Sequence, residues 1–196
     1  MLKFTMVKEI LQIGNPILNQ KSSSVTDFRD PELLTLIEDL LDTCKSKREI
    51  TAGLASPQIG GKLAVCICRR VDLEDEHGKN NVAEGKLWEV LINPEIVETS
   101  NKQSVIWEAC LSIGEADEML HGPVSRPKNV TVSYFKPDGS KGELSGGGFF
   151  SHLIQHEYDH LQGTLFLKYV TNPANIWREK DLNEYLEKYE TYPDIQ

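Results

Sequence analysis

QHEYDH, from Gln155 to His160, is the stretch that decides both the fold and the chemistry of this chain. His156 and His160 are four residues apart, so on a helix both imidazoles lie on one face, one turn apart. That spacing lets two imidazoles bind one metal ion. Glu157 lies between them, and H-E-x-x-H is the arrangement in which two histidines hold zinc while the glutamate acts as general base. The hexapeptide therefore predicts a helix that carries a metal site.

Two histidines do not complete such a site, because a catalytic metal takes three protein ligands and keeps one open position. His152 is eight residues from His160, about 12 Å along a helix axis. A single ion cannot comfortably span that distance, so we expect His152 on a pocket wall or at the surface. Glu179 follows His160 by 19 residues, which suits the third ligand of a thermolysin-like peptidase. Cys110, in WEACLSI, is the other candidate.

Composition narrows the classes of protein that this chain can belong to. Its 196 residues are 39% apolar and 26% charged, which is typical of one globular domain, and we expect a single domain over residues 1–196. A net charge of −9 argues against a nucleic-acid surface. No run approaches the roughly 18 apolar residues of a membrane span. The first residues lack the apolar core and cleavage site of a signal peptide, which favours a cytoplasmic location without a membrane partner.

Helices are expected near both ends of the chain. Asp30 followed by Pro31 is typical of a helix start, and apolar residues recur at helical spacing over residues 33–44. A last helix, rich in Glu and Lys, is predicted from Asn172 to about Tyr189, so that residues 171–196 form a C-terminal helix and tail.

Strands are expected between these helices. Alternating or β-branched runs predict strands over residues 62–68, 88–94, 102–107 and 129–135. A hairpin turn over residues 136–142 leads to a short return strand, and the long polar stretches 71–85 and 114–127 are expected to be connections. The order of these elements indicates an α+β fold, with mixed or antiparallel β-sheets around the central metal-binding helix.

The cysteines indicate buried thiols rather than disulfides. Four cysteines in a chain of this length, in a reducing compartment, do not read as a disulfide framework. Cys44 lies on the apolar stripe of the first helix, and Cys66 and Cys68 share one face of a strand. We expect these three to be structural.

Three motifs resemble the signatures of peptide deformylases. GLASPQIG at 53–60, EACLS at 108–112 and QHEYDH at 155–160 occur in that family's order. ILQIGNPILNQKSSSV and HLQGTLFLKYV, on either side, also resemble it, so that the likeness covers roughly residues 6–170.

The resemblance implies hydrolysis of the N-formyl group from the initiator methionine of new polypeptides, at the ribosome exit. It selects Cys110 as the third ligand, and a thiolate with two imidazoles suits Fe²⁺, Zn²⁺, Co²⁺ or Ni²⁺. The resemblance implies Fe²⁺ in the cell, with the other three as substitutes. It also implies Glu157 as general base, with the Gln58 side chain and the Leu111 N–H stabilising the oxyanion. The substrate would contact Gly53, Leu54, Ala109 and His152.

Several positions depart from the family's pattern. Thr51 and Ala52 stand before Gly53, Ser56 replaces an alanine, and Ala109 replaces a glycine. The stretch from Gly114 to Gly122 is longer than usual. It carries acidic residues that are expected to disfavour short acidic peptides, namely Glu115, Asp117 and Glu118. By resemblance, Glu108 is expected to pair with Arg126.

Two other functions remain open at this point. A thermolysin-like zinc peptidase would use Glu179 in place of Cys110. A metal-binding protein without activity would need a damaged Glu157 or Gln58, and both residues are intact.

Overall fold

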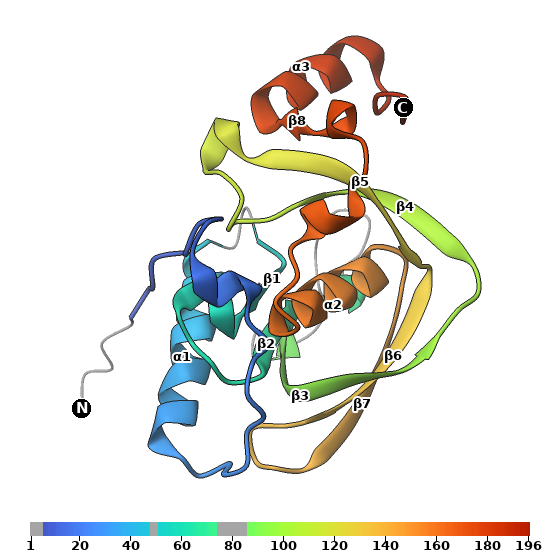
Figure 1. The fold of residues 1–196 in the computed structure, drawn as a ribbon. Helices are drawn as coiled ribbons and strands as arrows, with labels where there is room; N and C mark the ends of the chain where they lie inside the picture. The colour runs from blue at the N-terminus through green and yellow to red at the C-terminus, as the bar shows by residue number, and fades with distance from the viewer. Residues whose placement is uncertain (1–5, 48–50, 74–85) are drawn as a thin grey trace.

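The computed structural model describes residues 6–47, 51–73 and 86–196. Two antiparallel sheets pack around one central helix, α2 (Gly148–Leu161), as Figure 1 shows. This confirms the predicted α+β fold, although the only parallel pairing in the described residues is the isolated bridge between Ser23 and Leu63. Most of the connection expected over 71–85 lies outside the described residues; its start forms the short 3-10 helix η3 (Val71–Leu73).

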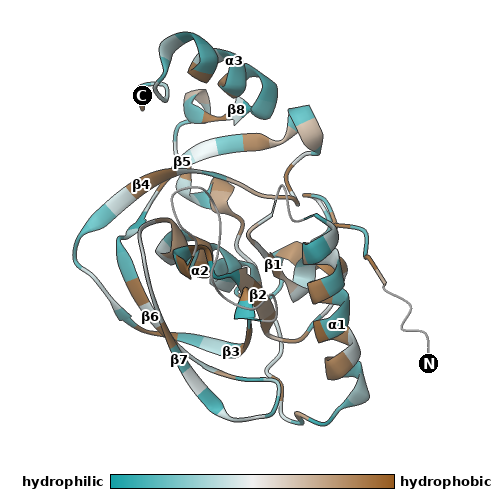
Figure 2. Ribbon diagram, turned by 180° about the vertical axis from the view of Figure 1, so that it is seen from behind, coloured by the Kyte–Doolittle hydropathy of each residue, from teal (hydrophilic) through white to brown (hydrophobic). Residues whose placement is uncertain are grey.

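The predicted first helix is present as α1 (Pro31–Ser46). The Asp30 side chain accepts a hydrogen bond from the Glu32 N–H at 2.8 Å, which satisfies one free donor of the first turn. The buried face of α1, including Leu33 and Leu40, packs against the sheet in the first core cluster. Figure 2 shows apolar residues recurring along α1, whereas α3 (Glu179–Tyr189) is mostly hydrophilic.

The larger sheet packs against α2. Its five strands lie in the order β1-β2-β3-β6-β7. Their bounds are Gly53–Ala55, Val65–Arg69, Trp88–Thr99, Asn129–Phe135 and Lys141–Gly147. β6 and β7 form the predicted hairpin, and the second core cluster lies between this sheet and α2. Cys44, Cys66 and Cys68 are buried and unpaired, as expected.

The smaller sheet corrects one expectation. Its order is β4 (Gln103–Ala109), β5 (Leu120–Pro127) and β8 (Trp177–Arg178), so a strand occupies much of the stretch that was expected to be a connection over 114–127. β5 was not predicted because it contains Gly122 and two prolines, and proline argues against a paired strand. In the described residues β8 pairs only with Leu120 and His121, so Pro123 lies where a missing N–H costs no bond to a third strand.

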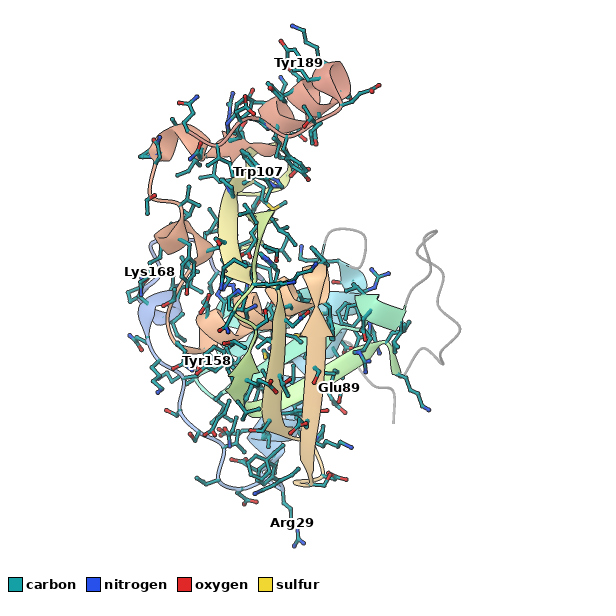
Figure 3. All side chains as sticks on the ribbon, turned by 90° about the vertical axis from the view of Figure 1, so that its right-hand side faces the viewer. Arg29, Glu89, Trp107, Tyr158, Lys168 and Tyr189 are labelled. Atoms are coloured by element: carbon teal, nitrogen blue, oxygen red, sulfur yellow. The ribbon has the colours of Figure 1, made fainter. Side chains whose placement is uncertain are left out.

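The C-terminal segment corrects another expectation. Asn172 caps only a 3-10 turn, η7 (Pro173–Asn175), instead of starting the last helix. β8 follows, and α3 begins at Glu179. Trp107 of β4 stacks on Tyr192 with ring centroids 5.5 Å apart, and Figure 3 shows Trp107 where the small sheet meets this segment. In the part of the chain that the structure describes, no helix has the length and apolar character to cross a bilayer.

Candidate metal centre and active site

α2 is a buried helix that presents most of its polar side chains inward. It starts at Gly148, whose φ of +55° is a left-handed conformation that glycine adopts without strain. His152, Glu157 and His160 are each at most 3% exposed, because sheets cover the helix on more than one side. Buried polar side chains need partners. These three residues therefore indicate where the candidate site lies.

Cys110 meets the two histidines of the hexapeptide. The ligand atoms of Cys110, His156 and His160 all lie within 4.8 Å of one another, and this is the only such group of three or more among the residues the structure describes. The Cys110 Sγ lies 3.3 Å from His160 Nε2. A thiol and two imidazoles in this arrangement fit a divalent transition metal ion such as iron or zinc, with one position left for water.

Glu108 orients one of the histidines of this group through a hydrogen bond. Its carboxylate accepts from His156 Nδ1 at 3.0 Å and from His152 Nδ1 at 2.9 Å. Arg126 donates to both of its oxygens, at 2.7 and 3.0 Å, which confirms the expected ion pair, and also donates to Asp159 at 2.6 Å. Burial would raise the pKa of Glu108, but the bonds from His152, His156 and Arg126 hold that pKa well below its usual range. With its Nδ1 bonded to Glu108, His156 has Nε2 left for an ion.

Glu157 lies in the cavity wall against Gly53. Burial raises the pKa of its carboxyl to about 7. Its Oε2 is buried and has no hydrogen-bond partner among the described residues, so it can accept from a bound molecule. Gly53 lies so close that a Cβ built on it would be 2.5 Å from Glu157 Oε1. Glycine at position 53 therefore makes room for the carboxylate.

Gln58 is fixed with its amide donor toward Cys110. Its Oε1 accepts from the Ala55 N–H at 2.8 Å, which turns the NH₂ group toward Ser112 Oγ at 3.2 Å and Cys110 Sγ at 3.5 Å. The Cys110 carbonyl accepts from the Ile113 N–H. Because a trans peptide directs its N–H opposite to its C=O, the N–H of Leu111 points away from that turn.

These groups open onto one cavity of about 530 Å³ between the two sheets. Ten of its lining residues come from the edge strands β1 and β4 and from α2, namely Gly53, Ile106, Trp107, Glu108, Ala109, Phe149, His152, Leu153, His156 and Glu157. Ala52 and Cys110 line it directly beside the ends of β1 and β4. Leu54 does not line it: its side chain packs in the core with residues of α1. His160 is buried and is not among the lining residues.

His152 lies in the cavity wall, and its Nε2 is 3.0 Å from Ser104 Oγ. The wall also includes residues that the sequence did not indicate, among them Met119, His121 and Phe149. No spacing pattern links these three residues to the motifs, since they come from the start of β5, the residue before it and the start of α2.

The acidic loop does not reach the cavity. Glu115, Asp117 and Glu118 are exposed and absent from its wall. Glu118 instead pairs with Arg178 at 3.4 Å. Glu179 does line the cavity, but its carboxylate bonds to His121 and lies outside the group of ligand atoms around Cys110.

A thiol, two imidazoles and a buried carboxyl in this arrangement are typical of metal-dependent hydrolases. Comparison with known proteins identifies the family within that class. The model of the polypeptide deformylase family matches residues 7–175. A peptide deformylase of Pseudothermotoga lettingae is 36% identical over 91% of this chain and 92% of its own. Peptide deformylase 1 of Prochlorococcus marinus is 39% identical over 87% and 84%.

Solved structures agree with these relatives. A peptide deformylase from Legionella pneumophila has a TM-score of 0.70 and 30% identity, over 94% of this chain and 95% of its own. A Met-Ala-Ser-bound class I type b peptide deformylase from Acinetobacter baumannii has a TM-score of 0.71 and 26% identity, over 85% and 100%.

This chain belongs to the peptide deformylase family. It is a metal-dependent enzyme that removes the N-formyl group from formyl-methionyl peptides. These findings favour deformylation over the thermolysin-like peptidase and the inactive metal-binding protein.

Proposed function

We propose that Cys110, His156 and His160 bind one divalent ion, Fe²⁺ in the cell, and that Glu157 is the general base. The observation that carries this assignment is the meeting of the three ligand atoms within 4.8 Å. The buried Glu157 Oε2, which lacks a partner in the described residues, supports it. Zn²⁺, Ni²⁺ and Co²⁺ suit the same donors.

The residues of the chain divide the reaction between them. An ion held by Cys110, His156 and His160 would supply a Lewis acid and a water that is acidic near neutral pH. Glu157 takes a proton from that water at Oε2 and passes it to the leaving amine. Gln58 Nε2 and the Leu111 N–H donate to the formyl oxygen as it becomes negative, and one lost donor of this kind costs roughly 10²–10³ in rate.

The peptide is held as an added strand along β1, the edge strand of the larger sheet. The side chain of the formyl-methionine enters the apolar part of the cavity, lined by Ile106, Phe149 and Leu153. Ala109 and His152 form the wall beside it. The nascent chain at the ribosome exit in the cytoplasm provides the substrate, in keeping with the tripeptide found in the Acinetobacter relative.

One catalytic domain covers residues 1–196 in this proposal. The C-terminal segment 171–196 is part of it, because Glu179 contributes to the wall of the same cavity as Cys110.

Formate release from formyl-Met-Ala-Ser tests the function. Protein purified without oxygen and loaded with Fe²⁺ should release one formate per peptide, and loading with Ni²⁺ or Zn²⁺ shows which ions substitute. Formate release that does not depend on the metal content of the protein would contradict the proposal.

A further inference from the structure

The cavity wall also carries a hydrogen-bonded histidine–glutamate pair that the proposed chemistry does not use. His121 of β5 and Glu179, the first residue of α3, both line the cavity and bond to each other through His121 Nε2 and Glu179 Oε2. Their side chains are 17% and 30% exposed. The pair is thus half-buried and open to a bound molecule.

Both oxygens of Glu179 are held in place. Oε2 bonds to His121, and Oε1 accepts from Asn183 Nδ2 at 3.2 Å. The Glu179 N–H donates to the Met119 carbonyl at 2.7 Å, which ties the start of α3 to the beginning of β5. A carboxylate in the first turn of a helix is also stabilised by the helix dipole.

The C-terminal segment that carries Glu179 is fixed to the wall at two more points. Arg178 and Trp177 pair with Leu120 and His121. Tyr192 stacks on Trp107, which lines the cavity from β4, near the top of Figure 3. The family model ends at residue 175, so Glu179 lies beyond the part of the chain that it matches.

The other two carboxylates on the wall have assigned roles. Glu108 is paired with Arg126, and Glu157 is the proposed general base. Glu179, beside a histidine, is the remaining carboxylate among the lining residues. The cavity volume of about 530 Å³ is that of a pocket for a molecule larger than one residue, so a peptide that enters it reaches beyond the formyl-methionine.

We propose that Glu179, positioned by His121, determines specificity for the residues that follow formyl-methionine and selects a cationic side chain over an acidic one. This inference rests on the proposed deformylation. An ion pair between the Glu179 carboxylate and a cationic side chain of the substrate changes affinity by roughly two- to fivefold. The effect is expected in KM, because neither residue of the pair has a role in the proposed bond cleavage.

The test compares three amidated peptides, formyl-Met-Ala-Lys, formyl-Met-Ala-Gln and formyl-Met-Ala-Glu, on the Fe²⁺-loaded enzyme. The expected order of kcat/KM is Lys, Gln, Glu, with nearly equal kcat. Glu179→Gln should remove the preference for the Lys peptide over the Gln peptide, and His121→Gln should reduce that preference through a higher KM for the Lys peptide. Glu179→Lys should reverse the order.

Glu184→Gln is the matched control, because it makes the same change of charge on an exposed position of α3. It should keep the Lys preference. Equal kcat/KM for the three peptides on the parent enzyme would overturn the inference, as would an unchanged preference in Glu179→Gln or the same loss in Glu184→Gln. Failure to release formate from any of the peptides would instead overturn the proposed function.

Discussion

Gly53 and Glu157 are closer than any side chain larger than hydrogen at position 53 permits. Gly53→Ala should therefore displace the Glu157 carboxylate. Overpacking of this kind costs about 1–3 kcal/mol of unfolding free energy, and a catalytic group displaced by 1 Å costs roughly 10²-fold in rate. The measurements are kcat/KM for deformylation and the urea midpoint.

A double-mutant cycle assigns the clash to its partner. In a Glu157→Ala background the atoms that meet the new Cβ are gone, so Gly53→Ala should cost under about 0.5 kcal/mol there, the scale at which independent sites add. The same loss in both backgrounds would mean that Glu157 is not what Gly53 accommodates.

Glu157→Gln keeps the size of the side chain and removes the proton acceptor. We expect unchanged metal content and a fall in kcat of about 10²–10⁴-fold, the usual contribution of a general base. Glu95→Gln, an exposed glutamate on β3, is the control and should retain full activity. A Glu157→Gln rate within tenfold of the parent, at equal metal content, would exclude Glu157 as the base.

At the scale of residues, the sequence is informative where spacing is local. The four-residue interval between His156 and His160 is a property of one helix, so it predicts two ligands directly. Cys110 lies 46 positions before His156, and only the resemblance to a family selected it over Glu179. The bonds of Glu108 to two histidines had no local signal, because they depend on how β4 crosses α2.

Among the elements, β4, β5 and α2 are joined by one ion-pair network. Arg126→Ala would leave Glu108 buried without its main counter-charge, and breaking a buried pair costs about 3–5 kcal/mol. We expect a lower urea midpoint and weaker metal retention, since Glu108 orients His156. Arg126→Lys should rescue little, because lysine cannot make the bidentate contact.

Arg29→Ala is the matched control for that variant. Arg29 is exposed and lies at the far end of the molecule from the C-terminal helix in Figure 3. Its removal should leave the midpoint unchanged. Equal midpoints for Arg126→Ala and the parent would show that the pair contributes nothing to stability.

At the scale of elements, α1 and the β6–β7 hairpin were predictable because an N-cap with proline, a turn and alternating residues are all local signals. β5 was not, since Pro123 is tolerated only because β8 pairs with Leu120 and His121 and does not extend to it. The start of the last helix was wrong for a related reason: Asn172 and Pro173 give the same signal for one 3-10 turn as for a long helix.

For the whole molecule, removing the metal should destabilise the fold. An ion at about 1,000 times its Kd adds about 4 kcal/mol to the free energy of unfolding. At about 2–4 °C per kcal/mol for a chain of this size, a chelator should lower Tm by about 8–16 °C. Thermal scans with and without chelator, together with metal analysis after dialysis, check this expectation.

Cys110→Ala should lose the bound ion and with it the response to chelator. Cys44→Ala is the control, because it deletes an equally buried thiol of α1 and should retain one ion per chain. Undiminished metal in Cys110→Ala would remove Cys110 from the ligand set.

The position of β1 has a consequence for how the enzyme avoids association with itself. Edge strands carry unpaired N–H and C=O groups and are templates for aggregation. β1 is such an edge, yet its three residues are buried and the adjoining cavity is walled by β4 and α2. A second sheet would collide with these walls, whereas a single extended chain end can enter. The same enclosure that admits a nascent N-terminus thus keeps folded proteins, and other copies of this one, from pairing with the edge.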